Sequence, residues 1–248
     1  MKISVFIITK NEEKNIEDCF RSVAWADEIV VVDSGSTDRT GEIVARYTDQ
    51  FFLNNFTDYS SQKNLALSKT SGDWVLSLDA DERVSDELRQ EILKTASLPD
   101  AGEGYRIPRR SMIFGRFFRY TGTTDDKPIR FFKRNTGKFY QPIHETVTVS
   151  GRVKELNHPI NHLTYSTIHD YLDRLNRYTT LEAEYFVQMK KTPQKSQLGL
   201  KSVAQFLRLY FWKQGFRDGL EGFLFSFLSA YYIFIKHAKH FEKSGELR

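Results

Sequence analysis

Two carboxylates stand two positions apart where an apolar run ends, in the segment VLSLDADERV at residues 75–84. In extended chain the side chains of Asp79 and Asp81 would point to the same side of the backbone. Two like charges held side by side repel unless a positive charge lies between them. Carboxylate oxygens are preferred ligands of hard divalent cations, and such a cation could screen a diphosphate. The pair therefore predicts a metal site, and a strand that only turns polar at its end is the alternative.

Polar residues follow two further apolar runs in the same way. TKNEE follows the first run and DSGSTD the second. In open parallel sheets ligands bind beyond the carboxyl ends of the strands, so the three polar clusters should lie where a ligand binds. Asp33 could accept a hydrogen bond from a base or a ribose hydroxyl, or only open the SGST turn that starts at Ser34. The sequence contains neither a Gly-rich dinucleotide fingerprint nor a P-loop, which favours a cation for holding a diphosphate.

These clusters need a sheet to position them. The strand-like runs are KISVFIIT, EIVVVD, QFFLN and WVLSLD, and stretches with helical spacing of apolar residues separate them. Ser85 is expected to cap one helix, with Asp86 and Glu87 in its first turn. Because strands that are apolar on both faces need cover on both sides, we expect an α/β fold: a mostly parallel sheet with helices on both faces.

The rest of the chain has a different texture. The whole chain contains one cysteine, Cys19, which fits a reducing compartment, and we expect a cytoplasmic protein. A polar helix is expected near residues 167–191, and the last fifty residues predict two amphipathic helices. Within them FLFSFLSAYYIFI is thirteen residues long, whereas a membrane span needs roughly 18–20. Aromatic residues with lysine and arginine nearby are typical of a helix in a membrane interface; a helical pair packed on the domain or on another subunit is the alternative.

The order and spacing of the motifs resemble glycosyltransferase family 2. The residues that carry the resemblance are SVFIITKNEEKNIEDCFRSV, EIVVVDSGSTDRT, QKNLALSKTSGDWVLSLDADE and IHE. It implies a GT-A catalytic domain over residues 1–165, with a nucleotide-binding half at 1–100 and an acceptor half at 101–165, before a helical, membrane-associating region at 166–248. It also implies an inverting transfer from a nucleotide sugar, usually a UDP-sugar. The expected donor contacts are Thr9, Asn11, Glu12, Asp33, Ser34, Lys63 and Asp79.

The resemblance also implies a metal and a base. Asp79 and Asp81 match the family's D-x-D motif, which binds Mg²⁺ or Mn²⁺ on the donor diphosphate. The acceptor hydroxyl must lose a proton as it attacks the anomeric carbon. The position that resembles the family's base is Glu145, although many members carry Glu-Asp where this chain has His144–Glu145. Either side chain could take the proton, and we favour Glu145.

The continuation of the chain looks like one branch of the family. GYRIPRRSMIFGRFFRYTG, IRFFKR, PIHE and the Phe-rich tail are similar to lipopolysaccharide inner-core β-1,4-glucosyltransferases, which transfer glucose from UDP-glucose to heptose. This likeness implies a lipid-linked lipopolysaccharide core acceptor at the inner-membrane surface, on its cytoplasmic face. Residues 104–138 hold ten Lys/Arg against two Asp, and no nucleic-acid motif occurs, so we expect no nucleic-acid partner. The expected acceptor contacts are Arg106, Arg130, Arg134 and His144.

Other functions fit part of the pattern. The same family could act on polyprenyl phosphate or another surface glycan. A glycosidase would cleave simple glycosides without nucleotide or metal, and a non-catalytic membrane-surface module would bind anionic glycans without turnover. His158 and His162 are spaced for metal binding on a helix, but Pro159 between them argues against a helix. Packing or acceptor contact is therefore favoured there, with His162 as an additional metal ligand the lesser alternative.

Overall fold

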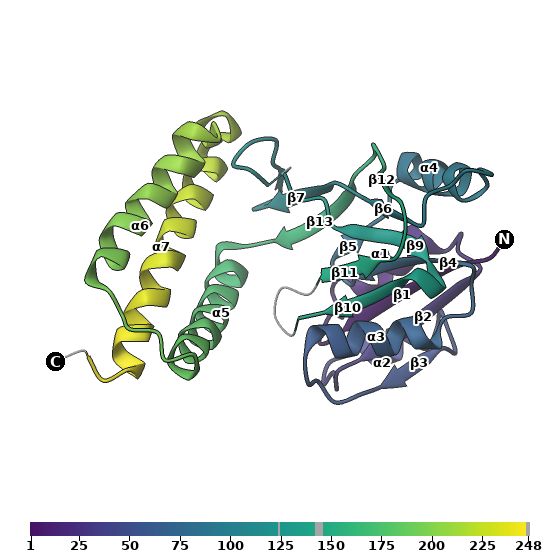
Figure 1. The fold of residues 1–248 in the computed structure, drawn as a ribbon, viewed down its shortest axis with the longest axis horizontal. Helices are drawn as coiled ribbons and strands as arrows, with labels where there is room; N and C mark the ends of the chain where they lie inside the picture. Colours follow the sequence, from purple (N-terminus) through teal and green to yellow (C-terminus); the bar gives the residue numbers. More distant parts are fainter. Residues whose placement is uncertain (124, 142–145, 247–248) are drawn as a thin grey trace. The chain divides into compact units, whose positions relative to one another are not determined.

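The computed structural model describes residues 1–123, 125–141 and 146–246 of the chain (Figure 1). The chain divides into two compact units. Unit 1 comprises Met1–Arg109 and Asp125–His162, and unit 2 comprises Arg110–Thr124 and Leu163–Arg248.

A seven-stranded sheet with the order β12-β6-β9-β4-β1-β2-β3 forms the centre of unit 1. Strands β4, β1, β2 and β3 run parallel to one another, as do β12 and β6, whereas β9 is antiparallel to both of its neighbours. The sheet is therefore mostly parallel, as the alternating pattern predicted. Its strands are β1 (Ile3–Thr9), β2 (Glu28–Asp33), β3 (Phe51–Leu53), β4 (Trp74–Asp79), β6 (Gly104–Arg106), β9 (Ile129–Lys133) and β12 (Val153–Glu155).

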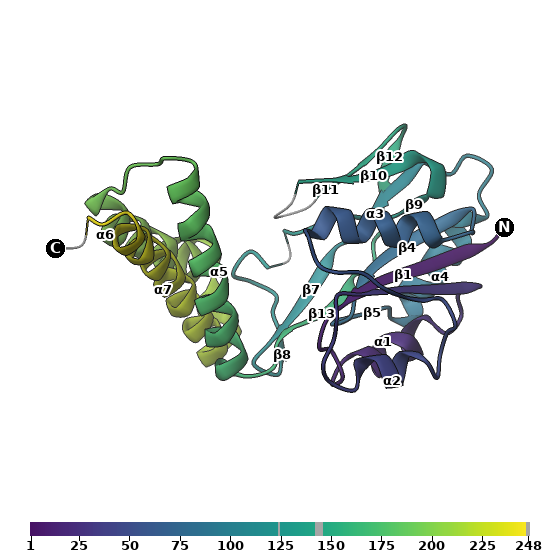
Figure 2. The ribbon, with the colours of Figure 1, turned by 90° about the horizontal axis from the view of Figure 1, so that it is seen from below.

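Helices cover both faces of this sheet (Figure 2). Alternate residues of β1 enter two separate buried clusters: Val5 and Ile7 pack with α1 and α4 on one face, whereas Phe6 packs with α3 on the other. The Ser85 hydroxyl caps α4 by accepting the Leu88 N–H at 3.3 Å, which confirms the predicted helix start. The helices are α1 (Ile16–Val23), α2 (Thr40–Val44), α3 (Tyr59–Lys69) and α4 (Asp86–Ala96).

Shorter strands complete the β-structure. A two-stranded antiparallel sheet pairs β10 with β11, and a four-stranded sheet has the order β5-β13-β7-β8. The division between the units falls within β7 and β13. These elements are β5 (Glu82–Arg83), β7 (Arg109–Ile113), β8 (Arg116–Phe117), the 3₁₀ turn η1 (Arg134–Thr136), β10 (Gly137–Tyr140), β11 (Thr146–Val149) and β13 (Ile160–Tyr165).

Unit 2 is built on three long helices. The expected polar helix and the two amphipathic helices after it are all present. No helix in the described residues is long and apolar enough to cross a membrane. The elements are α5 (Ile168–Gln188), α6 (Lys195–Leu207), the π-turn η2 (Arg208–Trp212), the 3₁₀ turn η3 (Gly215–Asp218) and α7 (Gly219–Lys243).

Residues 110–124 belong to unit 2, which differs from the expectation that 101–165 form one acceptor half. The buried Asp218 carboxylate accepts the N–H groups of Arg119 and Tyr120 at 3.1 and 3.0 Å. The Phe118 ring meets Phe225 of α7 edge-on, with 5.5 Å between centroids. These contacts join segments about a hundred residues apart, so the local sequence pattern did not indicate them.

Candidate active site

The carboxyl ends of β1 and β2 meet, as predicted. Thr9 pairs with Asp33 in register, and the Ser34 N–H donates to the Thr9 carbonyl at 2.9 Å. The buried Asp33 carboxylate accepts the N–H groups of Gly35 and Ser36 at 2.9 and 2.7 Å. Asp33 therefore opens the turn after β2, and its other expected role, contact with a nucleoside, remains a prediction.

The loop after β1 is tied to the loop after β2 by hydrogen bonds. Asn11 adopts a left-handed backbone (φ 55°) and its side-chain oxygen accepts the Thr37 N–H at 2.8 Å. The Glu12 N–H donates to the Thr40 hydroxyl at 2.8 Å. Since an αL backbone is tolerated by asparagine better than by most residues, Asn11 suits this tight connection. The two loops form one polar rim at the edge of the sheet.

Asp79, at the end of β4, lies between two cations supplied by the protein. Its two carboxylate oxygens lie 3.0 Å from Lys63 Nζ and 2.7 Å from Arg130 Nη2. The side chains of Lys63 and Arg130 are only 2% and 6% exposed. Burial alone would raise the pKa of Asp79, but the positive charges of Arg130 and Lys63 outweigh it and hold that pKa well below its usual value. A charged Asp79 is therefore neutralised from within the protein.

A third carboxylate extends this cluster. Glu82 is fully buried, and its two oxygens accept Arg130 Nη2 at 2.9 Å and the Asp79 N–H at 3.0 Å. Arg109 lies 3.5 Å from the same carboxylate and also pairs with Asp126. Neither Glu82 nor Arg109 was among the predicted site residues. The signal was the third acid of DADE, which local sequence gave no reason to separate from the D-x-D pair.

Asp81 does not share the environment of Asp79. The strand ends at Asp79 and the chain turns at residues 80–81, so the expectation of an extended chain with both side chains on one side is wrong. β5 then pairs antiparallel with β13, with His162 opposite Glu82. This pairing places His162 Nε2 3.4 Å from Asp81 Oδ2. Burial lowers the pKa of His162, but the hydrogen bond and charge of Asp81 raise it more, so it lies above its ordinary value.

The Asp81–His162 pair fits a divalent cation. Ligand atoms at about 2.1 Å from one octahedral ion lie about 3 Å apart, close to the 3.4 Å between these two side chains. In the residues that the structure describes, no three His, Cys, Asp or Glu side chains gather as a metal site. Remaining ligands would come from water and substrate phosphate, as is common for Mg²⁺. This geometry favours Asp81 over Asp79, whose two oxygens already face cations.

The expected acceptor residues are dispersed. Arg130 is buried in the ion-paired cluster instead of facing an open surface. Arg134 lies at the opposite end of β4, where its N–H donates to the Asp73 carbonyl at 3.1 Å, because β9 runs antiparallel to β4. Arg106 is exposed on β6 and donates to the Lys127 carbonyl. The predicted base Glu145 and its neighbour His144 lie outside the described residues.

Comparisons with known proteins identify the family and the fold. The profile described as "Glycosyl transferase family 2" matches residues 4–156. A lipopolysaccharide core biosynthesis glycosyltransferase, LpsC of Rhizobium meliloti (strain 1021), is 31% identical over 98% of this chain and 93% of its own length. An uncharacterized glycosyltransferase of Rickettsia typhi, RT0209, is 31% identical over 100% of this chain and 89% of its own. The crystal structure of S. aureus TarS 1-349 with UDP-GlcNAc superposes with a TM-score of 0.51 at 16% identity, covering 99% and 92% of the two chains. The α/β sheet of unit 1 is thus that of the GT-A fold.

Proposed function

Because the chain belongs to glycosyl transferase family 2, we propose that it is an inverting, metal-dependent hexosyltransferase that moves glucose from UDP-glucose onto a heptose of a lipid-linked lipopolysaccharide core. The observation that carries the proposal is the Asp81–His162 pair beside the ion-paired Asp79, where β4 ends. The likeness to LpsC over nearly the whole chain supports the acceptor class.

Two parts of the site would bind the donor: the residues at the end of β4 and the polar rim after β1 and β2. Asp81 and His162 would hold Mg²⁺ or Mn²⁺. The cation would supply positive charge that stabilises the departing diphosphate. Asp79, kept ionised by Lys63 and Arg130, is suited to accept hydrogen bonds from sugar hydroxyls. The polar rim after β1 and β2 would contact the nucleoside through Thr9, Asn11, Glu12, Asp33 and Ser34.

The acceptor hydroxyl needs a base as it attacks the anomeric carbon. Glu145 is our candidate on the motif PIHE, with His144 beside it. Attack on the face opposite the diphosphate inverts the anomeric centre. The new bond joins the acceptor oxygen to the anomeric carbon, the bond to the diphosphate breaks, and the acceptor proton passes to the base. Since the acceptor is lipid-linked, we place the enzyme peripherally on the cytoplasmic face of the inner membrane.

Calorimetric titration of UDP-glucose tests donor binding, first with Mn²⁺ and then with EDTA. Binding should require the metal, and Asp81→Asn should weaken it by about tenfold or more, an effect much larger than the loss of thermal stability. Asp86→Asn is the matched control, because that carboxylate is 93% exposed in the first turn of α4. Equal donor affinity in Asp81→Asn and the parent would remove Asp81 from the metal site.

Transfer to defined acceptors tests the chemistry and the acceptor. A heptose-containing core should be glucosylated, whereas polyprenyl phosphate should not. Glu145→Gln should bind donor like the parent and lose transfer by about 10²-fold or more, because a neutral amide cannot take the proton. A Glu145→Gln enzyme that turns over at the parent rate would show that another residue takes the acceptor proton. His144→Asn would then be the next variant to measure.

A further inference from the structure

Helix α7 exposes apolar side chains, whereas a helix in water usually exposes polar ones. Among residues 220–234, all of which the structure describes, each exposed residue is apolar or aromatic. They recur every three or four positions and so share one face: Leu220, Phe223, Phe227, Tyr231 and Phe234. The buried face carries the small residues Gly222, Ser226 and Ala230 instead. This is the reverse of the pattern that the surface helix of a globular protein shows.

Helix α6 repeats the pattern. None of its residues is buried, and an exposed apolar stripe at helical spacing runs through Leu200, Val203, Leu207 and, in the following π-turn, Phe211. Leu200 is 73% exposed, and Trp212, at the turn towards α7, is 82% exposed. Exposed apolar side chains gathered on one surface are typical of interaction sites.

Ring contacts join the two stripes into one surface. Phe206 of α6 meets Phe211 and Phe223 edge-on, with centroid distances of 6.4 and 6.0 Å. Phe223 in turn stacks on Phe227 at 6.4 Å. These contacts link α6, η2 and α7, and we call the exposed apolar side chains of the three elements the aromatic face; its members are Leu200, Val203, Leu207, Phe211, Trp212, Leu220, Phe223, Phe227, Tyr231 and Phe234.

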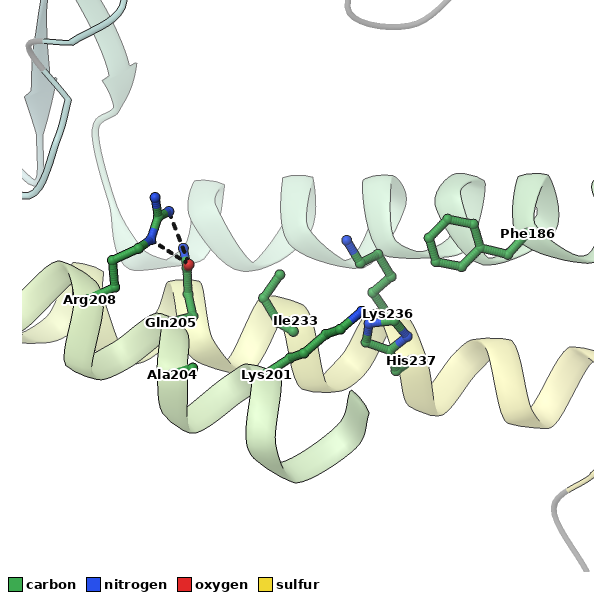
Figure 3. Close-up of a pocket in the computed structure, with 8 residues that line it drawn as sticks. All are labelled: Phe186, Lys201, Ala204, Gln205, Arg208, Ile233, Lys236 and His237. Carbon is green, nitrogen blue, oxygen red and sulfur yellow. Dashed lines mark hydrogen bonds between the residues drawn. The ribbon is translucent and has the colours of Figure 1, made fainter. Parts of the chain in front are cut away.

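Cations border the aromatic face along α6. Lys201 and Arg208 each follow a leucine of the stripe, so each lies about 100° around the helix from it. Among the described residues neither cation has a carboxylate partner, and Arg208 donates only to Gln205. Both line a pocket of about 350 Å³ with Lys236 and His237 of α7, in which Lys201 extends toward His237 (Figure 3).

Lysine side chains bring positive charge to the pocket. Burial, together with the charges of Lys236 and Lys201, lowers the pKa of His237 to about 4. Lys236 itself pairs with Glu182 at 2.9 Å. The pocket wall also includes Phe186 and Ile233, so apolar surface and positive charge lie side by side, as they do at the boundary of a lipid headgroup.

We propose that the aromatic face is a docking surface for an anionic phospholipid bilayer, and that Lys201 and Arg208 in the adjoining pocket receive a lipid phosphate. The proposal deepens the proposed function, on which its biological purpose rests. Trp212 and the phenylalanines would enter the boundary between headgroups and acyl chains, with the flanking cations at the depth of the phosphates.

Charge favours a lipid surface over a second copy of the chain. Residues 195–217 contain five Lys/Arg and no carboxylate. Two copies that met through this face would bring like charges together, which opposes association. An anionic bilayer supplies the opposite charge at about 1 kcal/mol per cation near the surface, equivalent to a factor of roughly five in partitioning. It also supplies the apolar phase that the phenylalanines lack in water.

Cosedimentation of the full chain with vesicles tests the proposal. The parent should bind vesicles of phosphatidylglycerol and phosphatidylethanolamine, and phosphatidylcholine vesicles much more weakly. Trp212→Ser with Phe227→Ser should lower the partition coefficient by about tenfold or more, because it removes apolar anchors. Lys201→Gln with Arg208→Gln should lower it by about 25-fold, a factor of roughly five for each cation, on anionic vesicles alone.

Controls carry the same chemical changes on unit 1. Lys94→Gln with Arg46→Gln removes two exposed cations, and Leu98→Ser removes a leucine that is 42% exposed; both should bind vesicles like the parent. Vesicle binding that is absent in the parent, or unaffected by Trp212→Ser with Phe227→Ser, overturns the proposal. A parent dimer in sedimentation equilibrium that this double variant converts to monomer would also overturn it, by assigning the face to a second copy.

UDP-glucose titration on the same preparations separates this proposal from the proposed function. Vesicle binding without donor binding would leave the docking surface standing and defeat the transferase assignment. Donor binding without vesicle binding would do the reverse. Both pairs of surface substitutions lie in unit 2, outside the donor site of unit 1, so they should leave donor affinity unchanged.

Discussion

Lys63 is a buried cation in the candidate site, and its charge, together with that of Arg130, keeps Asp79 ionised. Removing one partner of a buried ion pair leaves the other charge uncompensated. Because Asp79 keeps Arg130 and is itself 29% exposed, we expect Lys63→Met to lower the free energy of unfolding by about 2 kcal/mol, below the range for fully buried pairs. Lys69→Met, an exposed lysine on the same helix, should change it by less than about 0.5 kcal/mol.

The same substitution should alter the response to acid. A carboxyl whose folded-state pKa is depressed adds stability that is present above its unfolded pKa, near 3.9, and is lost as pH falls through the folded pKa. Lys63→Met should shrink the depression of the Asp79 pKa, so its stability should fall less steeply between about pH 5 and pH 2 than that of the parent. Urea unfolding at several pH values measures this. Parallel curves for the parent and Lys63→Met would show that Arg130 alone sets the pKa of Asp79.

At the scale of single residues, the sequence predicted which side chains lie in the candidate site better than it predicted which of them pair. Asp79 and Asp81 were predicted from spacing, and Lys63 was expected to contact the donor. The pairing of Lys63 with Asp79 was not predictable, because the ammonium group of Lys63 reaches the end of β4 from helix α3. For His162 the sequence favoured packing or an acceptor contact over metal binding, because Pro159 argues against a helix. In the structure β13 pairs with β5, and this pairing brings His162 to Asp81.

Close packing between η3 and α7 depends on glycine. A Cβ atom on Gly222 would lie 2.0 Å from the Gly215 carbonyl oxygen and 2.8 Å from Asp218 Cβ. Because backbone must move to relieve such a clash, Gly222→Ala should lower the free energy of unfolding by about 1–3 kcal/mol. Gly199→Ala on α6 is the control, since its Cβ would meet nothing within 4 Å; it should stabilise the helix by about 0.5–1 kcal/mol. A Gly222→Ala protein as stable as Gly199→Ala in urea would refute the close approach.

The same contrast explains which elements the sequence could predict. Apolar runs and caps are local, so the strands β1, β2 and β4 and the start of α4 follow from their own residues. The two-residue strand β5 and its pairing with β13 depend on residues about eighty positions apart. The reversed polarity of α7 is visible as a Phe-rich run, but which face is buried is decided by the helices that pack against it.

At the scale of the whole molecule, the chain crosses between its two units at residues 109–110, 124–125 and 162–163. A single boundary near residue 165 was expected, because the resemblance to the family's catalytic domain ends there. The contacts of Arg119 with Asp218 and of Phe118 with α7 are long-range, so the local sequence did not indicate them. The sequence therefore indicated a sheet followed by helices, but not that a segment of the acceptor half folds with the helices. The proposed donor site lies in unit 1, and the aromatic face lies in unit 2.

Because the proposed donor site and the aromatic face lie in different units, the effect of docking on catalysis can be predicted. A bilayer that holds both the enzyme and a lipid-linked acceptor raises their effective concentration without any change in the chemistry. Trp212→Ser with Phe227→Ser should therefore raise the apparent KM for an acceptor embedded in anionic vesicles by about tenfold, with kcat unchanged. The same variant should match the parent on an acceptor from which the lipid has been removed. A fall in kcat on both acceptors would mean instead that the substitutions disturb the fold of unit 2, and equal KM values on vesicles would mean that docking does not contribute to acceptor capture.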